Sequence, residues 1–202
     1  MWLDKASLSK MQKLLTVLLV LQILVFGSYR SARAEAPGQV IASPDGALRA
    51  LIIPLHNNGG FEESRVEIHG TGDKLLCTKD DSSNEGEHGL KVEKGRWTPD
   101  SRFFVYNTTS SGGHQAWHSP TFFYSRANNR IRNLEEVSHR VVLDQTPDPT
   151  FKIVPPHSVA TVSPGALYGV KGFGKDNDFV VLVNLETGAV SQQTKWPDKA
   201  LP

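Results

Sequence analysis

Four histidines are the residues of this chain whose types and spacing come closest to a metal site. His114 and His118 stand four residues apart, as two metal ligands do on one face of a helix. With His56, His88 and an acidic residue they would form a donor set that a divalent metal accepts. Glycines precede the pair, a proline follows it, and no glutamate completes an H-E-x-x-H motif. We therefore predict no metal or other cofactor and interpret the histidines as exposed loop residues.

A tryptophan and a glutamate extend this set into a candidate binding surface. Trp117 lies beside His118, and an exposed loop tryptophan can stack on a sugar or anchor a protein partner. Packing of Trp117 against the edge of a sheet is the other interpretation. Asp176 and Asp178 have the close spacing of calcium ligands, but the other residues of a calcium loop are missing. The predicted binding residues are His56, Glu62, His88, His114, Trp117 and His118.

The sequence indicates no nucleophilic catalysis. Its single cysteine, Cys77, lies in a strand-like run without an adjacent histidine, and there is no G-x-S-x-G motif. A lone cysteine also excludes an intramolecular disulfide. We expect no catalytic residues and hence a binding or protein-interaction module. Two alternatives stay open, a small metal-dependent hydrolase that uses the histidines and a structural component of the cell envelope.

The N-terminal segment, residues 1–34, has the features of a secretory signal peptide. Three lysines precede an apolar run over residues 14–26. Ala32-Arg33-Ala34 then supplies the small-x-small pattern of a cleavage site. The run is shorter than the ~20 residues that a membrane-spanning helix needs. We predict cleavage after Ala34 and export to the periplasm or the medium, with no membrane span afterwards. An uncleaved signal anchor is the alternative.

The charge of the processed chain bears on its partners. Removal of residues 1–34 takes away five of the 22 basic residues and one of the 21 acidic residues, which leaves a net charge of −3. The basic residues are scattered, and the densest group is Arg126, Arg130 and Arg132. A weakly acidic chain without a basic stripe is a poor ligand for nucleic acid. We expect another envelope or extracellular protein, or a glycan, as the partner, and leave the oligomeric state open.

A recurring turn predicts the architecture of the processed chain. Ser43-Pro44-Asp45-Gly46 and Thr98-Pro99-Asp100-Ser101 share its chemistry, and Ser163-Pro164-Gly165 is a weaker copy. Proline presets φ at the second position, and the leading hydroxyl bonds the backbone. Each turn stands between strand-like runs, which predicts one all-β domain over residues 35–202 with repeated four-stranded antiparallel sheets, A to D. Residues 151–154 are expected to add an edge strand. The repeating units are expected over residues 39–80, 88–137 and 157–196.

The second turn carries a resemblance to a known family. Residues 94–106, with Trp97-Thr98-Pro99-Asp100 among them, resemble the W-S-P-D-G signature of blades in TolB-type and WD40-like β-propeller proteins of bacteria. Residues 42–46 match the same turn without the tryptophan. The resemblance implies propeller-like sheets whose B–C and D–A loops gather on one rim, opposite the A–B and C–D turns. Closed propellers have at least four blades, and three units are recognised, so an irregular β-sandwich is the alternative.

Apolar residues at alternate positions of the expected strands predict the core. Their neighbours in sequence, such as Arg49 and Arg102, are expected to point to solvent. The predicted core residues are Ile41, Leu51, Ile53, Phe103, Val105, Phe122, Leu167, Val180 and Leu182.

Overall fold

A computed structural model describes most of the chain after the predicted signal peptide. The described residues are 38–56, 62–84, 88–112, 119–138, 151–163, 179–193, 197–199 and 201. They belong to one unit, Glu35–Pro202, and the predicted cleavage site at Ala34 lies outside them. No helix within these ranges has the length and apolar character of a membrane span.

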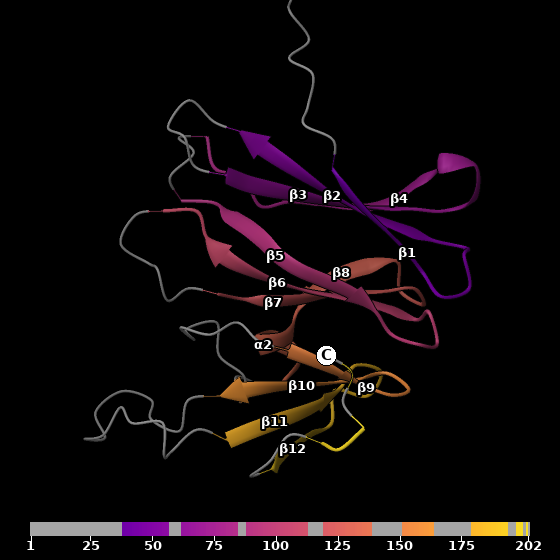
Figure 1. The fold of residues 1–202 in the computed structure, drawn as a ribbon, viewed down its shortest axis with the longest axis vertical. Coiled ribbons are helices and arrows are strands. Elements are labelled where there is room, and N and C mark those ends of the chain that lie inside the picture. Colours follow the sequence, from indigo (N-terminus) through magenta and orange to yellow (C-terminus); the bar gives the residue numbers. More distant parts are fainter. Residues whose placement is uncertain are drawn as a thin grey trace, which may run out of the picture. The chain divides into compact units, whose positions relative to one another are not determined.

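The described strands form three four-stranded antiparallel sheets, in each of which the strands follow one another in chain order (Figure 1). The first sheet holds β1 (Gln39–Ala42), β2 (Arg49–His56), β3 (Glu62–His69) and β4 (Leu75–Asp80), with the short helix η1 (Thr71–Asp73) before β4. The second holds β5 (Leu90–Trp97), β6 (Phe103–Ser110), β7 (Thr121–Ser125) and β8 (Arg130–Asn133), and helix α2 (Leu134–Val137) follows. The third holds β9 (Phe151–Val154), β10 (Ser158–Ser163), β11 (Phe179–Asn184) and β12 (Val190–Gln193). The predicted fold class, all-β with repeated propeller-like sheets, is confirmed.

The recurring turns fold alike because their side chains make the same hydrogen bonds. Ser43 Oγ donates to Asp45 Oδ1 at 2.6 Å, and Thr98 Oγ1 donates to Asp100 Oδ1 at the same distance. Each hydroxyl also accepts from the backbone N–H five residues later, at 3.0 Å in the first turn and 3.1 Å in the second. The turn sequence therefore fixes the β1–β2 and β5–β6 hairpins through local contacts.

The third sheet starts earlier than the sequence predicts. Phe151–Val154, expected as an extra edge strand, is its first strand, and Phe151 lies opposite Thr161 of β10. Pro155, Pro156 and His157 form the turn between β9 and β10, so the weak copy at Ser163 is not the first turn of this unit. That copy lacks the aspartate that organises the other two turns. The predicted strand over residues 167–172 lies outside the described residues.

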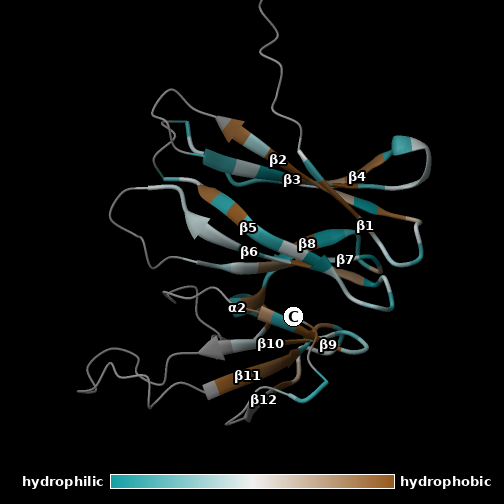
Figure 2. Cartoon of the chain, in the orientation of Figure 1, coloured by the Kyte–Doolittle hydropathy of each residue, from teal (hydrophilic) through white to brown (hydrophobic). Residues whose placement is uncertain are grey.

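The second sheet is covered on both faces. Alternate residues of β6 point in opposite directions. Phe103 and Val105 join the apolar cluster shared with the third sheet, whereas Phe104 and Tyr106 join the cluster shared with the first. Strands of the two outer sheets, such as β2 and β11, carry hydrophobic stretches as well (Figure 2). The indole N–H of Trp97 donates to the carbonyl of Ile41 at 2.9 Å, which also ties the first two sheets together. A strand that is buried on both faces is apolar at consecutive positions, as the first half of β6, residues 103–106, is.

The predicted core is right in the second sheet and one position out of phase in two strands of the outer sheets. Phe103, Val105, Phe122, Ile53 and Val180 are buried, as expected. Leu51 and Leu182 are half-buried, and so is Ile41, while Leu167 is outside the described residues. Both β2 and β11 are apolar at consecutive positions, so period-two alternation cannot show which face is inside. The residues that face the second sheet from these strands are Ala50, Ile52, Val181 and Val183.

Candidate functional site: the loop end of the sheets

The two ends of the sheets differ in how their polar groups are used. The end of the sheets that carries the β1–β2, β5–β6 and β9–β10 turns is called the turn end here. The opposite end is called the loop end. At the turn end Arg126 pairs with Asp45 at 2.5 Å, and the backbone N–H of Asp45 donates to Ser101 Oγ at 3.0 Å. These contacts link the first sheet to the second. The pKa of Asp45 is lowered, first by the hydrogen bond from Ser43 and then by the one from Arg126.

A second set of contacts at the turn end joins the second and third sheets. Arg102 makes two hydrogen bonds to the Glu186 carboxylate, at 2.6 and 3.1 Å. His157 lies between Asp100 and Glu186, with ring nitrogens 2.9 and 3.1 Å from their oxygens. Burial alone would raise the pKa of Asp100, but hydrogen bonds from Thr98, His157 and the backbone of Arg102 hold it below its usual value. The polar side chains at the turn end therefore stabilise the contacts between neighbouring sheets.

The lowered pKa of Asp100 predicts a pH-dependent contribution to stability. Because the pKa in the folded state lies below the ordinary value near 3.9, ionised Asp100 stabilises the fold above that value, and this contribution is lost as the pH falls through the folded pKa. We expect Asp100→Asn to cost about 1–2 kcal/mol at pH 7 and much less at an acidic pH below the folded-state pKa of Asp100. Urea unfolding at both pH values measures this. The same change at the exposed Asp198 is the control, and equal losses for Asp100→Asn at both pH values would contradict the prediction.

At the loop end, a buried glutamate binds the bases of two connections. Glu63, near the start of β3, has an exposed fraction of 1%. Its carboxylate accepts from Ser83 N and Oγ at 2.8 Å each, from Gly89 N at 2.8 Å and from Ser111 Oγ at 2.9 Å. Ser83 and Gly89 belong to the β4–β5 connection, and Ser111 starts the β6–β7 connection. We call this arrangement, Glu63 with Ser83, Gly89 and Ser111, the Glu63 anchor.

The electrostatics of the Glu63 anchor favour an ionised carboxylate. Burial raises the pKa of Glu63, but the four hydrogen bonds outweigh it, and the pKa lies below its usual value. Gly89 has no space for a side chain, since a Cβ there would lie 2.4 Å from the carboxyl carbon of Glu63. The backbone of the β4–β5 connection therefore packs directly on the charge.

The predicted binding residues lie differently with respect to this anchor. Glu62 is at the loop end, paired with Lys91 at 3.1 Å, and it faces His56 across the β2–β3 ladder. The side chain of His56 lies outside the description. His88 is exposed, and its backbone N–H donates to Ser83 Oγ of the anchor at 3.2 Å. His114, Trp117 and His118 are outside the described residues, although Ser111 and Ser119 on either side of them are described.

Sequence reasoning missed Glu63 itself. The sequence predicts its neighbour Glu62 as a binding residue in a polar loop. No local pattern indicates which of these two consecutive glutamates is buried. The four donors come from residues 20 to 48 positions away. Only the sheet pairing brings them together.

A polar pair lies beneath the loop end, between the first and second sheets. Lys79 Nζ is 2.5 Å from Asp81 Oδ1 and 4.6 Å from the centre of the Phe122 ring. Within the described ranges, Asp81 Oδ2 and the Tyr106 hydroxyl are buried without a hydrogen-bond partner. Burial raises the pKa of both groups. Buried oxygens of this kind commonly form hydrogen bonds with internal water. We therefore interpret Lys79, Asp81 and Tyr106 as residues that stabilise the structure beneath the loop end.

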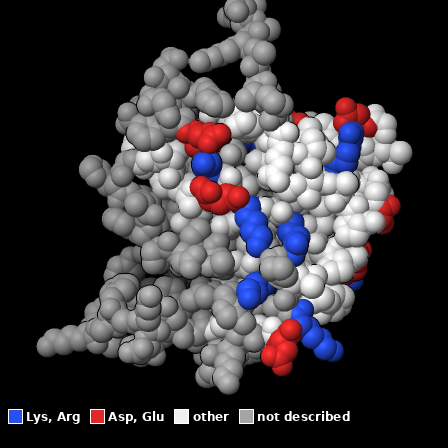
Figure 3. All heavy atoms as spheres, viewed as in Figure 1, with Lys and Arg blue, Asp and Glu red and all other residues white. Residues whose placement is uncertain are grey.

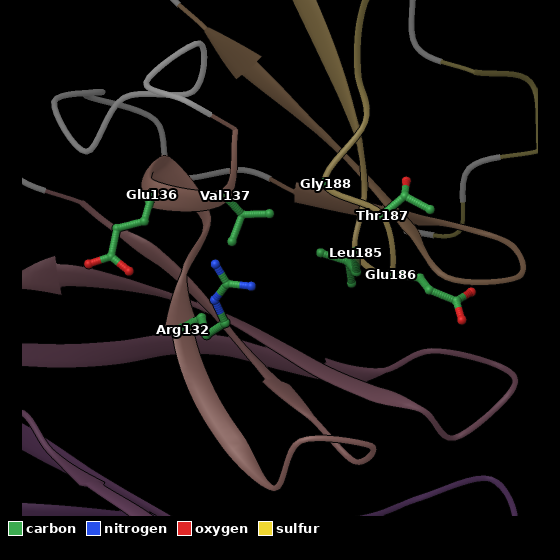
Figure 4. A pocket seen from close by; sticks show the side chains of 7 residues that line it. All are labelled: Arg132, Glu136, Val137, Leu185, Glu186, Thr187 and Gly188. Carbon is green, nitrogen blue, oxygen red and sulfur yellow. The ribbon is translucent and has the colours of Figure 1, made fainter.

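A small pocket lies beside α2 and the turn between β11 and β12 (Figure 4). Its volume is roughly 190 Å³, enough for one side chain or a small ion. In Figure 4 the guanidinium of Arg132 points toward Val137, while the carboxylate of Glu186 is directed away. It contains none of the predicted binding residues. Its lining residues are Arg132, Glu136, Val137, Leu185, Glu186, Thr187 and Gly188.

The described residues offer no ready metal centre. Among them, no group of three or more His, Cys, Asp or Glu side chains is placed to hold a metal ion. Cys77 is half-buried in β4 and packs against the apolar cluster between the first two sheets.

Comparisons with known proteins give a weak structural likeness. No protein-family model matches the chain, and no curated protein matches it. A solved structure of a protein from Lactobacillus plantarum has a TM-score of 0.41 at 14% identity and covers 81% of this chain and 42% of its own. The tricorn protease has a TM-score of 0.40 at 11% identity and covers 76% of this chain and 18% of its own. The chain thus spans less than half the length of either protein, and the fold class rests on its three sheets.

Proposed function

We propose that this protein is an exported, TolB-like β-repeat protein that binds a partner at the loop end and has no catalytic activity. The Glu63 anchor carries the proposal. A buried carboxylate with four hydrogen bonds holds Ser83 and Gly89 of the β4–β5 connection and Ser111 at the start of the β6–β7 connection. Both connections are therefore attached to the sheets at defined positions. Rigid scaffolds commonly present binding loops in this way.

The distribution of charge supports the same end. At the turn end, ion pairs such as Arg102 with Glu186 join neighbouring sheets and are used within the fold. At the loop end, Glu62 and Lys91 form a pair in which both side chains remain about 40% exposed, with Glu93 beside them. Polar groups held in place yet open to solvent suit a protein or glycan surface. The partner we propose is another envelope or extracellular protein, or a glycan.

Site-specific crosslinking tests the proposal. The exported protein would carry a photoreactive amino acid at Glu62 or His88, with Thr187 and Arg130 at the turn end as control positions. We expect crosslinked adducts in the intact cell from the first two positions and none from the controls. N-terminal sequencing of the same protein should begin at Glu35.

Two results would overturn the proposal. Adducts from Thr187 or Arg130 alone would place the partner at the turn end. Stoichiometric zinc or manganese in protein purified without a histidine tag, together with hydrolytic activity, would favour the metal-dependent hydrolase instead.

A further inference from the structure

The pocket beside α2 is lined by two oppositely charged side chains that do not pair with each other. Arg132 comes from β8 and Glu136 from α2, and both are exposed. Within the described ranges, neither side chain has a hydrogen bond or an ion pair. In Figure 4 the guanidinium of Arg132 points toward α2, whereas the side chain of Glu136 extends away from the helix. Both charges are therefore available to a ligand.

Charged side chains elsewhere on the described surface are commonly paired. Arg49 lies 2.6 Å from a carboxylate oxygen of Asp73. Arg102 lies 2.6 Å from a carboxylate oxygen of Glu186. On the face drawn in Figure 3, several acidic groups likewise have a basic group beside them. Two opposite charges that line one pocket without pairing are thus a distinctive feature of this site.

Local hydrogen bonds fix the wall that the β11–β12 turn contributes. The backbone N–H of Thr187 donates to Asn184 Oδ1 at 3.0 Å, and that of Gly188 donates to the Asn184 carbonyl at 2.8 Å. Gly188 has a φ of 73°, and a Cβ there would lie 3.3 Å from Val137 Cγ1. The turn therefore packs closely against α2. A ligand would enter a pocket whose shape is defined before binding, which lowers the entropy lost on association.

The third charged group of the lining, Glu186, already has partners. Its carboxylate accepts two hydrogen bonds from Arg102, at 2.6 and 3.1 Å, and lies 3.1 Å from His157 Nε2. The charges left for a ligand are therefore one positive and one negative. An anion would be attracted by Arg132 and repelled by Glu136, and a cation would meet the reverse. A ligand that carries both charges can interact favourably with both groups.

We propose that this pocket binds a small zwitterion, a molecule that carries one carboxylate and one ammonium group, such as a free amino acid. The carboxylate would form bidentate hydrogen bonds with the planar guanidinium of Arg132, and the ammonium would pair with Glu136. A cavity of about 150 Å³ holds benzene, so the roughly 190 Å³ of this pocket restrict the ligand to a similar size. None of the predicted binding residues of the loop end lines the pocket, so this site is additional to the proposed function.

A titration of the processed protein, followed by NMR at low ionic strength, tests the site. Glycine, β-alanine and γ-aminobutyrate are the zwitterionic probes, and they differ in the distance between their charges. We expect at least one of them to shift the backbone amide resonances of Val137, Thr187 and Gly188, with a Kd on the order of 1 mM. Propionate and propylammonium, which carry one charge each, should bind at least about tenfold more weakly.

Variants that each remove one charge make the test specific. Arg132→Gln and Glu136→Gln should each weaken binding of the zwitterion about tenfold. Arg130→Gln is the matched control, because Arg130 lies two residues earlier on β8, is exposed and does not line the pocket. It should change binding less than about twofold. In Glu136→Gln, propionate should bind no more weakly than in the unmodified protein, because a repelling carboxylate is removed.

Three results would overturn the proposal. The first is the absence of shifts with all three zwitterions, and the second is an equal loss of binding in Arg130→Gln and Arg132→Gln. The third is binding of propionate as tight as that of the best zwitterion, which would show that Glu136 takes no part. The substituted side chains are exposed, so the variants should keep the Tm of the unmodified protein. Thermal unfolding checks this and separates a loss of binding from a loss of folded protein.

Discussion

Replacing Glu63 by alanine should lower the free energy of unfolding by about 3–5 kcal/mol, because the donors of the Glu63 anchor would lose a buried, ionised acceptor. The backbone N–H of Gly89 donates to Glu63 in a buried hydrogen bond and would lose this acceptor. Glu63→Gln keeps one acceptor oxygen but directs an amide group at the remaining donors, so we expect an intermediate loss. Chemical denaturation followed by intrinsic fluorescence measures all three proteins.

Two further variants make the Glu63 prediction specific. Glu62→Ala, at the exposed neighbour, should cost less than about 1 kcal/mol because a solvated ion pair contributes little. Gly89→Ala leaves Glu63 in place but introduces a Cβ at 2.4 Å from its carboxyl group, so it should destabilise the protein as well. A loss below about 1 kcal/mol in Glu63→Ala would show that the anchor does not hold the connections.

The second large effect concerns two consecutive aromatic residues of β6. Phe103→Ala and Phe104→Ala should each cost about 3–5 kcal/mol, the usual range for a buried phenylalanine. Phe103 packs against Phe123 at 6.0 Å between ring centres, and Phe104 packs against Trp97 at 5.3 Å. Their side chains enter different apolar clusters, one on each face of the second sheet.

The pair tests the layered arrangement itself. In a sheet with one face in solvent, one of two consecutive substitutions would be mild and the other severe. Equal losses are expected only if the first and third sheets both cover the second. Urea unfolding of the two variants decides this, with Val40→Ala at an exposed position (57% exposed) as the control. A loss below about 1 kcal/mol for either phenylalanine would contradict the arrangement.

Local chemistry made the first two sheets predictable from the sequence. Proline and aspartate at Pro44-Asp45 and Pro99-Asp100 mark turns whose hydrogen bonds join residues only a few positions apart. The start of the third sheet was predicted wrongly, because its first turn, at Pro155-Pro156, has different residues. The weaker copy at Ser163 was taken as that first turn, so the predicted unit began after the actual first strand. A structural repeat can be recognised in the sequence only where its characteristic turn residues are present.

The candidate sites were harder to predict because they depend on pairing between distant segments. Glu63 receives a hydrogen bond from Ser111, 48 residues away. Long-range contacts of this kind leave no periodic signal.

The order of strands within each sheet has a consequence for how the chain acquires its structure. Every described sheet pairs strands that are consecutive in the chain, so each sheet needs no segment that comes later to complete its ladder. Contacts that are close in sequence form quickly, since little loop entropy is lost. The sheets can therefore form one after another, beginning with the first. The second sheet has an apolar surface on both sides, so it is fully covered only after the third sheet has formed.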